Sequence, residues 1–91
     1  MDARAIIGWN LRRLRVARGL SQERLALASG IDRAYVGRVE RGSENVTITT
    51  LEAMAGALIV PVADLLTAPP AGAPRPKPMP AGRRRRADTA R

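Results

Sequence analysis

Apolar residues between positions 1 and 68 recur at helical spacing rather than at every second position. Ile7, Leu11 and Leu14, for example, follow the i, i+4, i+7 spacing of a helix face that packs on a core. Capping residues and glycines stand between the apolar stretches, as they do where short helices start and end. The pattern predicts an all-α domain of five helices, each too short to be stable without packing on the others.

Residues that start and stop helices divide this part of the chain. Four side chains can accept hydrogen bonds from the free amides of a first helical turn and are candidate N-caps: Asp2, Ser21, Asp32 and Thr47. Three glycines are suited to end the first three helices: Gly19, Gly30 and Gly42. Pro61 is expected to open a short fifth helix. Beyond the first helix, the predicted inward-facing residues are Leu25, Ala28, Val36, Val39, Ile48, Leu51, Met54, Ala55, Leu58, Leu65 and Leu66.

Two glycines fall inside predicted helices, where glycine is about 0.8–1 kcal/mol less favourable than alanine. Gly37 lies in the third helix and Gly56 in the fourth. Close approach of another surface is the usual reason for such a glycine. For Gly37 two interpretations stay open, namely proximity to a partner such as DNA and neutral drift on an exposed face.

The C-terminal part of the chain has a different composition. Six of the seven prolines lie within residues 69–80, and no aromatic or β-branched residue follows until Thr89, so this segment cannot pack a core. Residues 69–91 carry six arginines and one lysine against one aspartate, which accounts for +6 of the net charge of +8. We predict a domain at residues 1–68 and a disordered Pro/Arg-rich arm at residues 69–91, with a basic tip formed by Arg83, Arg84, Arg85 and Arg86.

The excess of positive charge predicts a polyanionic partner. Nucleic acid fits best, although an acidic membrane surface or plain solubility would give a similar charge balance. The longest uncharged stretch of the domain, residues 53–63, contains Gly56 and Pro61 and is far shorter than the ~20 apolar residues of a membrane span. We therefore expect no membrane association.

The chain contains neither histidine nor cysteine. This excludes disulfides, thiolate or imidazole metal sites, and Ser-His-Asp or Cys-His nucleophiles. We expect no enzymatic activity, no metal and no cofactor. The lack of cysteine, together with an N-terminus unlike a signal peptide, favours a cytoplasmic location.

The segment from residue 20 to residue 42 has the length and turn chemistry of a helix-turn-helix, since two short capped helices are joined by Gly30-Ile31. Further matches lie at fixed separations: Leu14-Arg15, residues 18–23, Leu25-Ala26, Tyr35-Val36, residues 39–42 and residues 58–61 with Leu65. Over residues 5–66 the chain resembles the phage-repressor and Cro-type helix-turn-helix family, also called the XRE family. The resemblance implies a five-helix repressor-like DNA-binding domain, bacterial or phage-encoded, whose recognition helix spans about residues 33–41.

The exposed face of this recognition helix is the candidate base-reading surface. If Val36 and Val39 face the core, the outward residues are Arg33, Ala34, Gly37 and Arg38. The two arginines match family positions that read base edges, and a guanidinium can bind guanine O6 and N7 through two parallel hydrogen bonds. Ala34 can contact a thymine methyl group. The alternative is a solvated charged face with no DNA contact.

A second group of residues is suited to the phosphate backbone, which positions a protein without specifying sequence. Ser21 and Asp32 begin helices whose free N–H groups can bind phosphate. Gln22 resembles a family phosphate clamp, although an exposed Gln without a partner is the alternative. The group is completed by Tyr35, for which packing on the second helix is equally open, and by Arg41 and Asn45.

Three further residues stand outside these two groups. The resemblance implies that Arg15 and Glu40 form a structural ion pair that ties the first helix to the end of the recognition helix. Trp9 matches no family position, and three interpretations stay open: stacking on an arginine stem, a dimer contact, and a seat for the proline-rich arm.

Together these features predict a homodimeric, sequence-specific regulator of transcription, most simply a repressor, that binds double-stranded DNA. The basic tip of the arm would add non-specific phosphate contacts, or would serve solubility alone. The alternative function is an antitoxin-type protein of a toxin-antitoxin pair, which would bind a protein partner as well as DNA.

Overall fold

The computed structural model describes residues 1–72, and the predicted basic tip at Arg83–Arg86 lies outside this range. Within residues 1–72 the chain forms helices and no strands, so the predicted all-α fold is confirmed. There are five helices in this range: α1 (Ala3–Ala17), α2 (Gln22–Ser29), α3 (Arg33–Glu40), α4 (Ile48–Leu58) and α5 (Ala63–Leu66). None of them has the length and hydropathy required to cross a membrane.

The four predicted N-caps all function as caps. In each case the side-chain oxygen accepts a hydrogen bond of 2.9–3.1 Å from a backbone amide in the first turn, and the caps are Asp2, Ser21, Asp32 and Thr47. Capping matters here because α2 and α3 have only eight residues each and a free first turn is a large part of such a helix. α5 begins two residues after Pro61, whose carbonyl oxygen accepts a bond from Asp64.

Helices α1 to α4 end in the same backbone motif. A residue with positive φ follows the helix, and the amide after it donates to a carbonyl five residues back, as in a Schellman motif. Glycine occupies the positive-φ position after α1, α2 and α3, as predicted, at Gly19, Gly30 and Gly42. After α4 the position is held by Ile59 at φ 57°, for which the sequence carries no signal.

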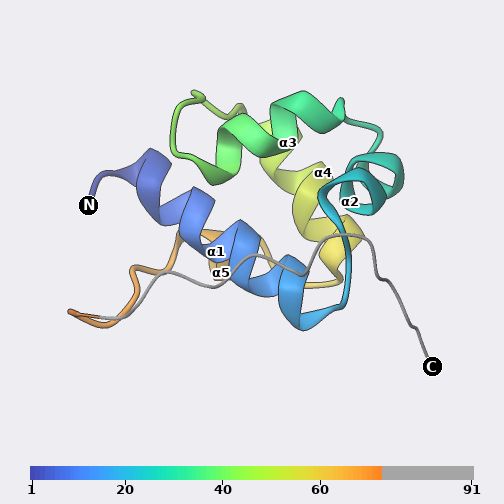
Figure 1. The fold of residues 1–91 in the computed structure, drawn as a ribbon. Helices are drawn as coiled ribbons and strands as arrows, with labels where there is room; N and C mark the ends of the chain where they lie inside the picture. The colour runs from blue at the N-terminus through green and yellow to red at the C-terminus, as the bar shows by residue number, and fades with distance from the viewer. Residues whose placement is uncertain (73–91) are drawn as a thin grey trace.

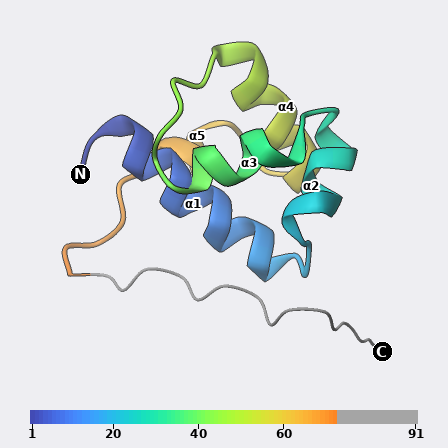
Figure 2. The ribbon, with the colours of Figure 1, turned by 45° about the horizontal axis from the view of Figure 1, so that its top comes forward.

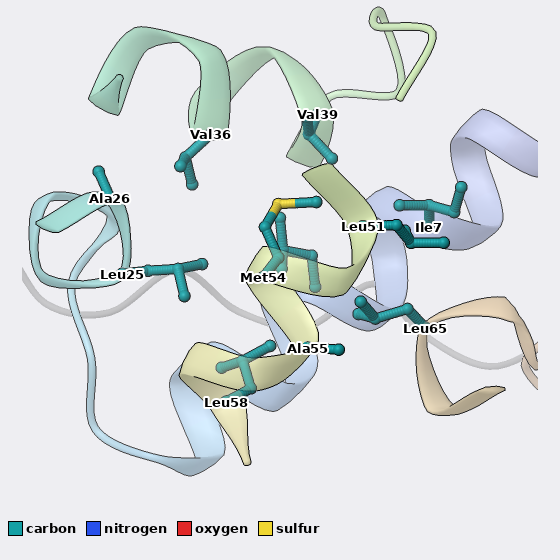
Figure 3. Packing of buried hydrophobic residues seen from close by; sticks show 11 residues of the cluster. Ile7, Leu25, Ala26, Val36, Val39, Leu51, Met54, Ala55, Leu58 and Leu65 are labelled. Carbon is teal, nitrogen blue, oxygen red and sulfur yellow. The ribbon is translucent and has the colours of Figure 1, made fainter. Parts of the chain in front are cut away.

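The buried apolar residues form one cluster to which all five helices contribute. Figure 3 shows Val36 and Val39 pointing from α3 toward Met54 of α4, with Leu25 and Leu65 on either side. Most of the predicted core is confirmed, but three predicted members are exposed instead: Ala28, Ile48 and Leu66.

The three wrong core assignments have simple geometric causes. α2 packs on both α3 and α4, which places Ala26 rather than Ala28 beside Leu25 in the core. Ile48 is the first residue of α4 and lies before the part of the helix that crosses the core. In the single turn of α5, Leu65 is buried and the adjacent Leu66 points away from it.

α1 packs on α3, α4 and α5 (Figures 1 and 2). One side of α1 packs on α3 and the other on α5, whereas α2 packs on α3 and α4. The segment after α5 is tied to α1 by Asn10, whose side chain is 1 % exposed. Its amide Nδ2 donates to the carbonyl oxygens of Leu65 at 3.1 Å and Thr67 at 2.8 Å. The start of the C-terminal segment is thereby fixed on α1.

Trp9 lies beside this junction. The guanidinium of Arg13 lies over the indole ring of Trp9, 5.4 Å from the ring centroid. This is the stacking on an arginine that was one of the three interpretations of Trp9. Trp9 and Arg13 also line a surface hollow of about 290 Å³ together with residues 67–70. The structure thus places the first residues of the predicted arm beside Trp9. A dimer contact at Trp9 stays a prediction. The domain boundary at residue 68 also stays a prediction.

Candidate nucleic-acid interface

α3 is held by one face and leaves the other open. Val36 and Val39 are buried in the core, whereas Arg33 and Ala34 are exposed and Arg38 is partly exposed. In Figure 2, α3 lies across the molecule with α1 and α2 beside it. A short helix fixed in this way presents its charged side chains from a rigid support.

Gly37 differs from the expectation that it faces outward, because it is buried. A Cβ atom at this position would lie 3.4 Å from Nη1 of Arg41 and 3.7 Å from Oε1 of Gln22. The side chains from the start of α2 and the end of α3 therefore meet over the Gly37 backbone. Both atoms belong to the ends of flexible side chains, so this packing does not require a glycine, and the two interpretations of Gly37 given by the sequence stay predictions.

Gln22 has a defined partner in the structure. Its amide Nε2 donates to Oε1 of Glu40 at 3.1 Å. Because a carboxylate only accepts hydrogen bonds, this contact fixes which end of the amide carries the nitrogen. One N–H of Nε2 is engaged, and the second is left for another acceptor. Gln22 is thus oriented at the N-terminus of α2, where Ser21 is the cap.

Glu40 is the centre of a buried polar network. Arg15 donates to both of its oxygens, from Nε at 2.6 Å and from Nη2 at 2.9 Å, which is the ion pair implied by the family resemblance. Arg12, which was not among the residues predicted from the sequence, adds a bond from Nε at 3.3 Å. Nη1 of Arg15 also donates to the carbonyl of Leu20 before α2. The network joins α1, the turn before α2 and the end of α3.

The charge on Glu40 is stabilised by these donors. Burial alone would raise the pKa of Glu40, but hydrogen bonds from Arg15 and Gln22 and the positive charge of Arg15 outweigh it. The pKa of Glu40 therefore lies below its ordinary value of 4.5. The carboxylate stays ionised, and it keeps both Gln22 and the end of α3 in place.

The remaining candidate residues form a second group at the exposed side of α3. The guanidinium of Arg38 lies over the ring of Tyr35, 5.7 Å from its centroid, and its Nε is paired with Glu44. Tyr35 and Asn45 also line a surface hollow of about 510 Å³ that reaches Asp32 and the start of α4. Glu44 was not anticipated, because an isolated acidic residue in a loop has no sequence signal.

The structure thus brings the candidate residues together in two groups. Gln22 and Arg41 meet over Gly37. Tyr35 and Asn45 line the hollow before α4, and Arg38 lies over the ring of Tyr35. Arg33 and Ala34 lie at the N-terminal end of α3 beside Asp32. Within residues 1–72 there is no cluster of three or more acidic, histidine or cysteine residues that could hold a metal ion.

Comparison with known proteins supports the same architecture. Residues 11–65 match the helix-turn-helix family. The chain is 46 % identical over 68 residues to a hypothetical transcription factor of Neisseria meningitidis, which covers 75 % of this chain and 64 % of that protein. It is 48 % identical over 67 residues to the control protein C.SmaI of Serratia marcescens, covering 74 % of this chain and 80 % of that protein.

Solved structures show the same similarity in three dimensions. The crystal structure of the Neisseria transcription factor superposes with a TM-score of 0.73 over 75 % of this chain and 78 % of that one, at 46 % identity. The restriction-modification controller protein C.AhdI of Aeromonas hydrophila superposes with a TM-score of 0.67 at 48 % identity, over 68 % of this chain and 94 % of that one. The chain belongs to the helix-turn-helix family.

Proposed function

We propose that this protein is a sequence-specific DNA-binding regulator of transcription that inserts α3 into the major groove. The observation that carries the proposal is the arrangement of α3, which is buried through Val36 and Val39 and open at Arg33, Ala34 and Arg38. An α-helix fits the width of the major groove, and arginine is the residue that most often reads guanine there. We therefore expect a G·C pair in each half-site.

The proposed phosphate contacts flank this helix. α2 and α3 each start with free backbone N–H groups, at Ser21 and Asp32, which can bind phosphate oxygens. Gln22 is oriented by Glu40 and has one N–H left for such an oxygen. Arg41 and Asn45 are exposed, and we assign them to the backbone on either side of the groove together with Tyr35.

We further propose that the protein acts as a homodimer. One eight-residue helix reads few base pairs, and two copies about 34 Å apart would read a partly palindromic operator in successive major grooves. Two large apolar side chains that the fold leaves exposed, Ile59 after α4 and Leu66 in α5, are suited to such a contact. Ile59 is 73 % exposed although it is a large apolar residue.

The arm that follows the domain is proposed as a non-specific contact. Arg83, Arg84, Arg85 and Arg86 lie outside the described residues, and the proposal rests on their charge alone. Four adjacent guanidinium groups would bind phosphates with little regard for sequence and would make the affinity more dependent on salt.

The relatives support a more specific form of the proposal. Three of them are named as a control protein, a restriction-modification controller and a phage immunity repressor. We propose that the chain represses transcription and does so in the bacterial cytoplasm. Restriction-modification genes beside this gene would support a controller. A toxin that co-purifies with the chain would instead support the antitoxin alternative.

Selection of bound duplexes from a random DNA pool tests the proposal. The full chain should enrich one partly symmetric sequence with a G·C pair in each half. Arg33→Ala and Arg38→Ala should each weaken binding to that sequence more than to a random duplex. Arg13→Ala is the charge-matched control, because Arg13 lies on α1 against Trp9. A pool that shows no enrichment contradicts sequence-specific binding.

A further inference from the structure

Arg38 differs from Arg33 in how it is held. Nε of Arg38 lies 2.5 Å from Oε2 of Glu44, and the backbone oxygen of Arg38 accepts two bonds of 3.0 Å from Ser43, one from N and one from Oγ. Arg33 is exposed, and no hydrogen bond or ion pair within residues 1–72 engages its side chain. The two candidate base-reading arginines are therefore not equivalent.

The turn after α3 brings Glu44 to this position. Gly42 has φ 77°, and its amide donates to the carbonyl of Val39 while that of Ser43 donates to Arg38. This Schellman motif folds the chain back along the end of α3. As a result the loop and Arg38 are joined at both backbone and side chain, so the position of the carboxylate is set by the helix itself.

Tyr35 holds the guanidinium from a second direction. The ring lies one turn before Arg38 on α3, and Cζ of Arg38 is 5.7 Å from its centroid. With Nε bonded to Glu44 and one face near the ring, the donors left over are those of the two terminal nitrogens, Nη1 and Nη2. The side chain of Arg38 is still 44 % exposed, so these donors can reach a ligand.

Stability does not explain the Arg38–Glu44 pair. Ion pairs with this much solvent exposure contribute little to folding. A carboxylate beside a surface that meets DNA also repels phosphates. A role in recognition accounts for both facts, since an oriented guanidinium binds one geometry of acceptors and rejects others.

We propose that Glu44 is a specificity-determining positioning residue that acts through Arg38. By holding Nε, it directs Nη1 and Nη2 toward the O6 and N7 atoms of one guanine and prevents Arg38 from turning to a phosphate. The inference rests on the proposed DNA-binding function and deepens it. Arg33, which lacks such a partner, supplies affinity with less dependence on geometry.

Two substitutions of equal charge test the proposal in the full chain. Glu44→Ala removes the acceptor of Nε, whereas Glu44→Gln removes the same charge and keeps a carbonyl oxygen in its place. Dissociation constants are measured for the selected operator, for operators with each base pair changed singly, and for a random duplex at several salt concentrations. Arg38→Ala identifies the base pair that Arg38 reads.

Glu44→Ala should reduce discrimination at that one G·C pair by about tenfold, within the range that a bidentate contact supplies. It should also steepen the salt dependence of random-duplex binding by about one phosphate contact. Glu44→Gln should retain most of the discrimination. In an Arg38→Ala background, Glu44→Ala should change discrimination no further, because its effect passes through Arg38.

Three results would overturn the inference. The first is unchanged discrimination between base pairs in Glu44→Ala. The second is equal discrimination in Glu44→Ala and Glu44→Gln, which would indicate an effect of charge alone. The third is tighter operator binding with full discrimination in Glu44→Ala, which would show that the Arg38–Glu44 ion pair opposes DNA binding and must break when DNA binds. If the wild-type chain selects no sequence at all, the proposed function itself fails. If Arg38→Ala alters discrimination and Glu44→Ala does not, only the present inference fails.

Discussion

Gly8 in α1 lies directly against the carbonyl oxygen of Val39 in α3. A Cβ atom at Gly8 would clash with that oxygen and would stand 2.8 Å from the carbonyl oxygen of Glu40. Both obstacles are backbone atoms, which cannot turn aside as a flexible side chain can. The close approach of the two helices, and hence the position of the end of α3, therefore depends on the absence of a side chain at Gly8.

Gly8→Ala should consequently destabilise the protein by about 1–3 kcal/mol, the usual range for overpacking a core, and lower the melting temperature by several degrees. Gly56→Ala is the matched control, because Gly56 is exposed within α4 and, apart from its chain neighbours and the backbone of its own helix, no described atom lies within 4 Å of the site of its Cβ. That change should stabilise the helix by about 0.5–1 kcal/mol. Equal effects in thermal unfolding would contradict the proposed close approach.

Arg15→Met separates a structural role of Arg15 from a role in DNA binding. The substitution leaves Glu40, which is 3 % exposed, without its main donor, and we expect a loss of about 3 kcal/mol in the free energy of unfolding. Replacing both residues by apolar ones should be less harmful than either single change. An unchanged denaturation midpoint together with weaker DNA binding would identify Arg15 as a DNA contact instead.

The network around Glu40 also predicts acid sensitivity. The pKa of Glu40 is lowered in the folded chain, so its contribution to stability is complete above the unfolded value of about 4.5 and is lost as the pH falls through the folded pKa. Urea midpoints measured from about pH 6 to about pH 3 should fall in the wild type and fall less steeply in Glu40→Gln. Glu52→Gln, at an exposed position of α4, should keep the wild-type slope.

Ile59→Gly should increase the stability of the isolated chain. Ile59 holds a left-handed conformation, with φ 57°, that glycine adopts freely and a β-branched residue does not. Since the side chain is largely exposed, little buried area is lost, and the gain should be about 1 kcal/mol. Sedimentation at increasing concentration should show weaker self-association if Ile59 lies in the dimer contact. A lower melting temperature under monomeric conditions would contradict the strain argument.

Deleting residues 73–91 tests the proposed arm. The slope of log affinity against log salt should become shallower, because each lost phosphate contact reduces it by about 0.9. The preferred operator should stay the same, since these contacts carry no sequence information. A chain ending at residue 72 that retains the wild-type slope would exclude the arm from DNA binding.

The sequence predicted the helices well because local chemistry determines where they start and stop. Asp2, Ser21, Asp32 and Thr47 cap their helices in the structure as expected. Features that depend on the contact between helices had no local signal. The close approach at Gly8 arises from the packing of α1 on α3. Ile59 takes the left-handed position that ends α4, although a β-branched residue gives no sequence signal for that position.

The sequence predicted which candidate residues α3 leaves exposed better than it predicted the contacts that they make, and their membership of a DNA interface stays a prediction. Residue spacing placed Arg33 and Arg38 on one face of α3, but helical periodicity cannot predict which of the two forms an ion pair with an acidic residue of a neighbouring loop. Glu44 reaches Arg38 only because Gly42 reverses the chain. Likewise Gln22 and Glu40 are 18 residues apart in sequence and meet only once α2 and α3 have packed together.

The bonds from Asn10 to the carbonyls of Leu65 and Thr67 define where the C-terminal segment leaves the domain. Asn10 lies on the helix that also supports α3, so the tether point keeps a constant position relative to α3. For a tethered ligand, the local concentration at its target is set by the length of chain between the two. Under the proposed function, inserting or deleting residues after Gly72 would therefore change how often the basic tip meets DNA, while the helices of residues 1–72 stay the same.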